Sequence, residues 1–232
     1  GRYEVEPHTD LLDRNIRNKT VLITGAGGSI GSEISRQVTK NYAKKVILLD
    51  SNEFALFEIK KEIESYELDV GVYSVLANVT NKNKIKEVCK TFNVETIYHA
   101  AAYKHVSLVE ENPFEAVFNN IFGTEVCVTA AIETNVETFV LVSTDKAVRP
   151  TNIMGATKRL SEMILQALSQ ETNNSITRMT MVRFGNVIGS SGSAIPLFQK
   201  QIKDGGPLTV THKEVTRFFM SIPEAAELVI QA

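Results

Sequence analysis

Short runs of apolar and β-branched residues alternate along the chain with longer segments in which apolar residues recur at helical spacing. The short runs predict strands at residues 20–24, 46–50, 71–77, 96–99, 138–143 and 178–184. The longer segments predict helices at residues 29–41, 53–67, 82–92, 113–134 and 153–170. Repeated strand–helix alternation with short connections predicts an α/β fold built on a parallel, doubly wound, Rossmann-like sheet.

Some predicted strands are apolar on successive residues rather than on alternate ones. Val21, Leu22 and Ile23 form one such run, and residues 46–49 form another. Strands that are covered by helices on both faces of a parallel sheet have this composition. We therefore expect helices to cover these two strands on both faces.

The two ends of the chain depart from the alternation. Residues 1–19 are polar and have no clear period, so they are predicted to form an N-terminal arm rather than an element. Residues 20–184 are predicted to form the dinucleotide-binding domain, including the active site. From residue 185 onward Gly, Ser and Pro interrupt the pattern, which indicates a smaller substrate-binding region over residues 185–232. Within it Pro223 and Glu224 are typical of a helix start, and we expect this region to be incomplete at its C-terminus.

The composition is that of an ordinary globular protein, with 43% hydrophobic and 22% charged residues. A net charge of −2 gives no electrostatic reason to expect a nucleic acid partner. No apolar run approaches the roughly 20 residues of a membrane span, and no signal peptide is present. Cys89 and Cys127 each lie in an apolar helical context, which favours buried thiols and a reducing, cytoplasmic compartment.

A glycine-rich turn follows the first predicted strand and opens the first predicted helix. It contains Gly25, Gly28, Ser29, Ile30 and Gly31. Glycines at this place permit a tight turn and a close backbone approach to a pyrophosphate at a helix N-terminus. Asp50 ends the second predicted strand about 20 residues later, the spacing of a ribose-binding acid. Because no Lys or Arg follows Asp50 and a carboxylate repels a 2′-phosphate, the sequence predicts NAD rather than NADP.

Further cofactor contacts are predicted near the ends of the next strands. Asn78 is a candidate for the adenine edge, with an Asx turn as an equal alternative. Ala100, Ala101 and Ala102 follow the fourth strand, where small side chains let a cofactor lie against the backbone, although a plain helix start also tolerates them. Asn120 is polar within an apolar helical stretch. It is either a cofactor contact or a hydrogen-bonded core amide.

The candidate reacting groups follow the fifth predicted strand, because ligands of doubly wound sheets bind beyond strand C-termini. Thr144, Asp145 and Lys146 lie at this point. In extended backbone neighbouring side chains point in opposite directions, so Asp145 and Lys146 are expected to serve as separate acid and base groups. A solvated surface loop is the alternative.

The next predicted helix carries Met154 and Lys158, which share a helix face because they are four residues apart. A short-chain dehydrogenase carries a tyrosine base four residues before such a lysine. Methionine cannot accept a proton, so either the chain is an inactive dehydrogenase or its chemistry has moved to Asp145 and Lys146.

Substrate contacts are predicted among basic and polar residues around the site. Arg183 suits bidentate phosphate binding, with a structural ion pair as the alternative. The other candidates for substrate binding are Lys104, Asn186, Ser193 and Arg217. His99 and His105 have no further ligands at suitable spacing, so no metal site is predicted.

Several of these segments together resemble the extended short-chain dehydrogenases, and within them the nucleotide-sugar 4,6-dehydratases of polysaccharide biosynthesis that act on UDP-N-acetylglucosamine. The resemblance covers residues 20–232 and rests on residues 24–31, 99–106, 143–152, 155–158 and 182–187. The Thr-Asp-Lys strand end is its specific part. Methionine at position 154 is itself a feature of one branch of that family.

The resemblance implies roles for the candidate residues. The glycine turn and Asp50 bind NAD, Lys158 holds the nicotinamide ribose, and Thr144 contacts the sugar near C4. Oxidation at C4 acidifies the C5 proton, which Lys146 removes while Asp145 protonates the departing C6 hydroxyl. The resemblance also implies a UDP-sugar substrate, a homo-oligomer, and a membrane region outside this chain that holds the protein at the inner face of the cell membrane.

Two other functions are compatible with the same pocket. A nucleotide-sugar 4-epimerase uses the same scaffold, but it needs a base at the C4 hydroxyl, where Met154 stands. A non-catalytic NAD-binding regulatory domain has no need of any base. The acid–base pair at Asp145 and Lys146 favours the dehydratase.

Overall fold

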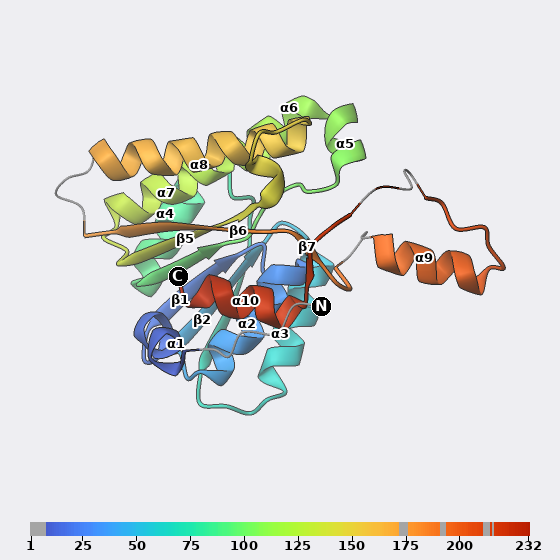
Figure 1. Ribbon diagram of the computed structural model, residues 1–232. Helices are drawn as coiled ribbons and strands as arrows, with labels where there is room; N and C mark the ends of the chain where they lie inside the picture. Colours follow the sequence, from blue (N-terminus) through green and yellow to red (C-terminus); the bar gives the residue numbers. More distant parts are fainter. Residues whose placement is uncertain (1–7, 172–175, 191–193, 211–213, 215) are drawn as a thin grey trace.

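A six-stranded parallel sheet forms the centre of the molecule in a computed structural model, which describes residues 8–171, 176–190, 194–210, 214 and 216–232 (Figure 1). The strand order is β3-β2-β1-β4-β5-β6. The strands are β1 Thr20–Thr24, β2 Lys45–Asp50, β3 Gly71–Leu76, β4 Thr96–His99, β5 Thr138–Thr144 and β6 Arg178–Phe184. All five pairings are parallel, and the order reverses at β1 and β4. The predicted fold class is confirmed, and the predicted strands match to within one residue.

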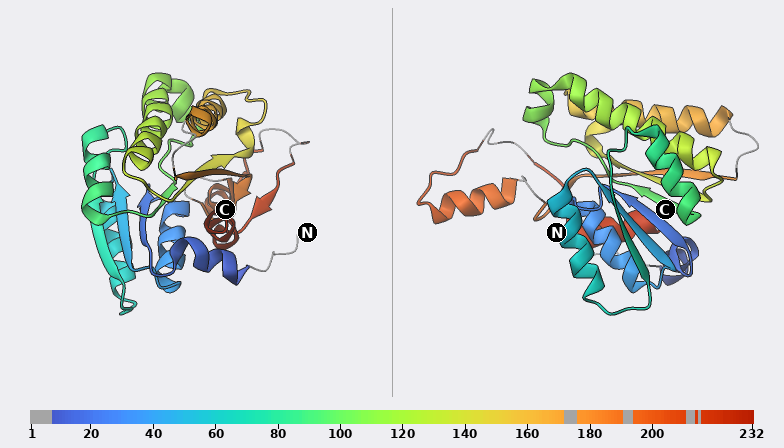
Figure 2. Two further views of the ribbon diagram at one scale, coloured as in Figure 1. Left: turned by 90° about the vertical axis from the view of Figure 1, so that its left-hand side faces the viewer. Right: turned by 180° about the vertical axis from the view of Figure 1, so that it is seen from behind.

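Helices cover both faces of the sheet (Figure 2). On one face α2, α3 and α10 pack on side chains such as Val21 and Ile23, and on the other α4, α7 and α8 pack on Leu22. The bounds are α2 Ser29–Lys40, α3 Glu53–Glu64, α4 Lys82–Phe92, α7 Gly123–Glu133, α8 Ile153–Glu171 and α10 Ile222–Ile230. Successive strand residues therefore enter two different cores, which explains the continuous apolar runs. Cys89 and Cys127 are buried as free thiols, as predicted.

The helix expected over residues 113–134 is divided. A short α6 (Pro113–Ala116) leads into a π-helical segment η1 (Val117–Phe122), and α7 follows. The helix expected over residues 53–67 ends at Glu64, and Glu67 adopts a left-handed φ of 53°. The spacing of apolar residues predicts neither the π-helical segment nor the early end of α3, because it indicates only which face of a helix is buried.

The prediction of an N-terminal arm without an element is wrong for part of that segment. Residues Thr9–Ile16 form a helix, α1, whose Leu12 and Ile16 are buried in the core beside α10. The Thr96 hydroxyl donates to the Asn15 carbonyl at 2.8 Å, which joins α1 to the end of the sheet. The four-residue spacing of Leu12 and Ile16 was the available signal for this helix.

The region after residue 184 does not form a body separate from the sheet. Two short strands, β7 (Asn186–Val187) and β8 (Phe219–Met220), pair in parallel, and α9 (Ala194–Lys203) extends away from the sheet (Figure 1). The chain then returns through α10, which packs beside α2. The Tyr98 hydroxyl at the centre of the sheet donates to the Ile230 carbonyl at 3.2 Å. The last helix of the predicted substrate region is therefore part of the Rossmann core.

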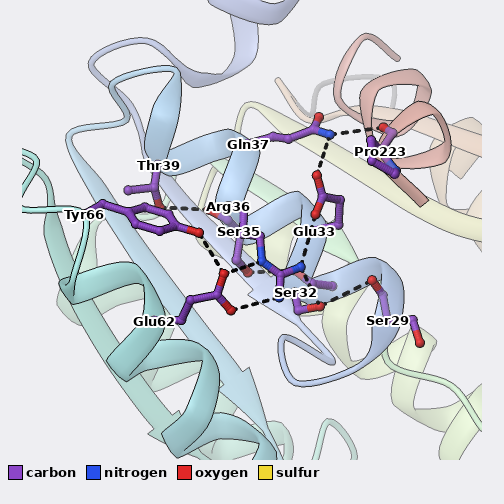
Figure 3. Close-up of polar contacts among 11 residues, drawn as sticks. Ser29, Ser32, Glu33, Ser35, Arg36, Gln37, Thr39, Glu62, Tyr66 and Pro223 are labelled. Carbon is purple, nitrogen blue, oxygen red and sulfur yellow. Dashed lines mark hydrogen bonds and ion pairs between the residues drawn. The ribbon is translucent and has the colours of Figure 1, made fainter. Parts of the chain in front are cut away.

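A polar cluster holds α2 against its neighbours (Figure 3). Arg36 of α2 donates to both carboxylate oxygens of Glu62 in α3, at 2.7 and 2.9 Å, and Glu62 also accepts from the Tyr66 hydroxyl. Gln37 donates to the Pro223 carbonyl in α10 at 3.1 Å. Since α2 begins at the glycine turn, these contacts fix the helix whose N-terminus faces the site.

No helix in the described parts of the chain combines the length and the apolar character needed to cross a bilayer.

Candidate active site

The glycine turn between β1 and α2 is built by close backbone approaches. Gly25 has a φ of +69°, and a Cβ on it would lie 2.7 Å from the Ala101 nitrogen. A Cβ on Gly31 would lie 2.0 Å from the Gly25 carbonyl oxygen. These contacts admit only glycine, because real Cβ atoms do not approach other heavy atoms so closely. The turn therefore leaves room for a ligand at the N-terminus of α2, as a dinucleotide requires.

Two cavities meet at this turn and share Gly25, Gly28, Ala100, Ala102 and Tyr103 in their walls. One has a volume of about 240 Å³ and contains Asp50; we call it the Asp50 cavity. The other has a volume of about 340 Å³ and contains Lys146; we call it the Lys146 cavity. The Asp50 cavity is also lined by the predicted contact Ala101. The Lys146 cavity is also lined by the predicted contacts Ser29, Ile30 and Gly31.

The Asp50 cavity is organised by one carboxylate. Asp50 accepts hydrogen bonds from the Gly27 nitrogen and the Asn52 nitrogen, both at 2.9 Å. The described lining contains no Lys or Arg side chain. This environment fits a ribose whose hydroxyls are free, and it disfavours a 2′-phosphate. Gly27 was missed by the sequence argument, which considered only the glycines in the spaced triplet.

The two predicted asparagine contacts do not line either cavity. Asn78 is exposed, and its side-chain oxygen accepts from the Thr80 nitrogen at 2.9 Å, which is the Asx turn named as the alternative. Asn120 is buried within η1, where its amide bonds the backbone nitrogen and carbonyl of Tyr103 and the Thr157 hydroxyl. It is therefore a core amide that holds the loop shared by the two cavities.

The Lys146 cavity is lined by basic side chains. Lys104, His105, Lys146 and Lys158 line it, and no Asp or Glu does among the residues that the structure describes. Burial lowers the pKa of the Lys104 ammonium. Among the substrate candidates, Lys104 and Asn186 lie in this wall, as predicted. The cavity is thus complementary to an anionic ligand such as a nucleotide diphosphate.

The proposed acid and base are in contact with each other. Residues Asp145–Ala147 form a single 3₁₀ turn, η2, rather than extended backbone. The Lys146 ammonium lies 3.0 Å from Asp145 Oδ1 and donates to Asn186 Oδ1 at 3.2 Å. The expectation that the two side chains point in opposite directions is therefore wrong, since alternation holds only in a strand. Only Lys146 of the pair lines the cavity.

Helix α8 carries Met154 and Lys158 into the same wall. Met154 is buried, with 4% of its surface exposed, and packs with Val109 of α5 (Val106–Glu111) and with Ala116. Lys158 is 6% exposed, and burial lowers its pKa to about 8 although the Glu162 carboxylate acts in the opposite direction. The wall therefore presents a thioether beside a buried amine, with no phenol at that position.

Helix α8 is held against η2 by a single small residue. A Cβ on Gly155 would lie 2.3 Å from the Lys146 carbonyl oxygen, and the Gly155 nitrogen donates to Asn152 Oδ1 at 2.8 Å. Gly155 thus sets the distance between the helix that carries Lys158 and the turn that carries Lys146.

The arginines have different places from those expected. Arg183 forms a bidentate ion pair with Glu162, which is the structural alternative. Arg217 is exposed, donates to the Thr216 carbonyl and does not line either cavity. Ser193 lies outside the described residues. Sequence reasoning missed several lining residues, of which Ser143 had the clearest signal as the last residue before Thr144; the others include Tyr103, His105, Phe184, Gly185 and Phe219.

No cluster of three or more His, Cys, Asp or Glu side chains suited to a metal ion occurs within the described part of the chain.

The family model for "Polysaccharide biosynthesis protein" matches residues 21–232. The chain belongs to that family. It is 53% identical to the capsular polysaccharide biosynthesis protein CapD of Staphylococcus aureus, over all of this chain and 39% of CapD. It is 34% identical to a UDP-N-acetylglucosamine 4,6-dehydratase (inverting) of Campylobacter jejuni, over 91% of this chain and 62% of that protein. A UDP-glucose 4-epimerase of Rickettsia rickettsii is 36% identical over 93% of this chain and 62% of its own length.

Solved structures share the fold of this chain. The structure of Pen from Bacillus thuringiensis superposes with a TM-score of 0.87 at 38% identity, covering 93% of this chain and 65% of that chain. DesIV, a dTDP-glucose 4,6-dehydratase from Streptomyces venezuelae solved with NAD and TYD bound, has a TM-score of 0.78 at 22% identity, covering 92% of this chain and 72% of its own. The chain spans about two fifths of CapD and less than two thirds of the Campylobacter and Rickettsia relatives.

Proposed function

We propose that this protein is an NAD-dependent nucleotide-sugar 4,6-dehydratase that acts on UDP-N-acetylglucosamine. The observation that carries the proposal is the strand end at Thr144, Asp145 and Lys146. There a carboxylate and an amine are in contact beside a cavity that has Met154, and no tyrosine, four residues before Lys158. The relationship to a 4,6-dehydratase at 34% identity supports the same reaction.

NAD is the proposed cofactor because the two joined cavities provide for both of its halves. The Asp50 cavity suits the adenosine ribose, the glycine turn suits the diphosphate, and the Lys146 cavity suits the nicotinamide and the sugar. A related fold solved with NAD bound supports this arrangement. When bound, NAD supplies the reversible oxidation that makes the sugar C5 proton acidic.

The contact between Asp145 and Lys146 provides a way to keep the protons in balance. Elimination of water requires a base at C5 and an acid at the C6 hydroxyl. Lys146 as a neutral amine accepts the C5 proton, and Asp145 as a carboxylic acid donates to the departing hydroxyl. These forms differ from the observed ion pair by one proton transfer across 3.0 Å. Elimination therefore leaves the two groups as this ion pair, and return of the proton from Lys146 to C5 leaves a neutral amine beside the Asp145 carboxylate.

Thr144 extends this arrangement toward the C4 hydroxyl. Its hydroxyl donates to Asp145 Oδ1 at 3.0 Å and lines the Lys146 cavity. A proton released from the C4 hydroxyl passes through Thr144 to Asp145, and the same proton then leaves with the C6 hydroxyl as water. This path needs no tyrosine at position 154, because Met154 takes no part in proton transfer.

A 4-epimerase is the second candidate, since relatives named UDP-glucose 4-epimerase are 36% identical. The two reactions differ in the mass of their products. After incubation of the protein with UDP-N-acetylglucosamine and NAD, mass spectrometry is expected to show loss of one water from the sugar nucleotide. An unchanged mass with a new C4 epimer in the sugar analysis would identify the epimerase, and an unchanged substrate would refute both enzymes.

A further inference from the structure

A buried carboxylate lies directly behind the Lys146 cavity without lining it. Glu162 is on α8, one helical turn beyond Lys158, and its side chain has no exposed surface. Its oxygens accept from Ser143 Oγ at 2.6 Å, Arg183 Nε at 2.7 Å and Arg159 Nη1 at 3.0 Å, as well as from a second Arg183 nitrogen. Burial acts to raise the pKa of Glu162, but hydrogen bonds from Arg183, Ser143 and Arg159 lower it to about 2. Glu162 is therefore an anion at neutral pH inside the protein.

The two arginines and Lys158 differ in how strongly water screens them. The Arg159 and Arg183 side chains are 42% and 37% exposed, whereas Lys158 is buried. Charges in contact with water are screened more than buried ones. Within the interior, the charge of Glu162 therefore acts on Lys158 in spite of the two arginines.

The other charged or titratable groups around Lys158 do not favour its ammonium form. His99 on β4 is fully buried, and burial together with the charge of Lys158 lowers its pKa to about 3, so it is neutral. Arg159 on α8 and Arg183 on β6 are paired with Glu162, and Lys146 in η2 is paired with Asp145. Glu162 is thus the anion that faces Lys158 among the described residues packed around it.

The Ser143 hydroxyl is fixed by the same carboxylate. Ser143 is 3% exposed, precedes Thr144 at the end of β5 and lines the cavity. Because its hydrogen is directed to Glu162, the oxygen lone pairs are the part of Ser143 that a ligand in the cavity meets.

We infer that Glu162 is a positioning residue of the cofactor site, which supplies the counter-charge for the Lys158 ammonium and orients Ser143 as a hydrogen-bond acceptor. An ammonium donates more hydrogen bonds to ribose hydroxyls than a neutral amine does. This inference rests on the proposed NAD site, but it concerns binding of the cofactor and is independent of which sugar is transformed.

The test is the affinity of the intact protein for NAD, measured by calorimetry without sugar between pH 6 and pH 10. Lys158 has a lowered pKa of about 8, so the ammonium is present below that pH and binding weakens as the pH rises through it. In Glu162→Gln the midpoint is expected to move down by about one pH unit or more, because an anion near a buried lysine is lost. At pH values above both midpoints this corresponds to binding about tenfold weaker than in the parent.

Arg183→Gln is the matched control, since it breaks the same ion pair from the other side. In Arg183→Gln the removal of a cation is expected to raise the pH midpoint of NAD binding. The loss of thermal stability is expected to be similar in the two variants. Midpoints equal to the parent in both variants, or displaced in the same direction, would overturn the inference. If Glu162→Gln does not fold, the pH midpoint of NAD binding in Arg183→Gln is the test: an upward shift supports the inference, and an unchanged or lower midpoint overturns it. A protein that binds NAD with these displacements but dehydrates no sugar would refute only the proposed reaction.

Discussion

The Asp50 cavity and the Lys146 cavity share a glycine turn but are built in different ways. The Asp50 cavity is shaped mainly by backbone atoms and small side chains, and its one charge is fixed by two backbone nitrogens. The Lys146 cavity has basic side chains in its wall, and one of them, Lys146, is paired with Asp145. A site made of backbone holds a constant ligand, whereas a site made of titratable side chains performs chemistry. The difference predicts that a change at Asp50 alters the affinity for NAD, whereas changes at Asp145 and Lys146 alter turnover.

The largest effects are expected at the acid–base pair. Lys146→Ala and Asp145→Ala should each lower dehydration by about 10²–10⁴-fold, as expected for removal of a general base or acid. Their affinity for NAD should change little, because the Asp50 cavity and the glycine turn remain. Single-turnover kinetics with UDP-N-acetylglucosamine, together with NAD titration, measure both quantities. A variant that loses affinity and turnover in parallel would contradict the division between the cavities.

The Lys146→Ala variant also separates two stages of the reaction. It is expected to accumulate absorbance of reduced cofactor with the sugar bound, since oxidation at C4 precedes the step that needs Lys146. In deuterated water the parent enzyme should place deuterium at C5 of the product, because the lysine ammonium exchanges with solvent before it returns the proton. Product without deuterium at C5 would exclude Lys146 as the C5 base.

A smaller effect, confined to binding, is expected at Asp50. Asp50→Asn removes the charge but keeps the shape, and should weaken NAD binding by about 10- to 100-fold, the equivalent of one hydrogen bond to a charged group. Binding of NADP should improve relative to NAD, since the repulsion of a 2′-phosphate is lost. Turnover at saturating NAD should stay close to that of the parent. Titrations with both cofactors test this, and an unchanged preference for NAD would show that the carboxylate does not face the ribose.

The smallest effect is expected at Met154. Met154→Leu conserves volume in a buried position and should cost less than about 1.5 kcal/mol of stability. Turnover should remain within a few-fold of the parent, because the thioether transfers no proton. Thermal unfolding and a steady-state assay are sufficient to test this. A loss of turnover as large as that of Lys146→Ala would show that Met154 has a direct role in catalysis.

The sheet, its strands and the glycine turn could be predicted because each depends on local signals. Burial of a strand on both faces is visible in the unbroken apolar run Val21, Leu22 and Ile23. The close backbone approaches of the turn are visible in the absence of a side chain at Gly25 and Gly31. The same reasoning overlooked α1, because Leu12 and Ile16 become a core only against α10, more than 200 residues later.

The candidate site was predicted in its residues rather than in its contacts. Lys146 and Lys158 line the expected cavity. The pairing of Lys146 with Asp145, however, depends on a 3₁₀ turn that the pattern of apolar residues does not predict. The sequence left phosphate binding and an ion pair as alternatives for Arg183, because its partner Glu162 is 21 residues away and the sequence alone does not show which acid contacts which base. Non-local pairs of this kind limit any prediction from spacing alone.

The contact of Gly155 with the Lys146 carbonyl has a consequence for substitutions at the neighbouring position. Helix α8 is docked on the turn through position 155, where a Cβ would lie 2.3 Å from the Lys146 carbonyl oxygen. A side chain of similar volume at position 154 is therefore expected to leave Lys158 and the turn at Lys146 in place. Gly155 thus separates the spacing of the two lysines from the identity of the residue beside it.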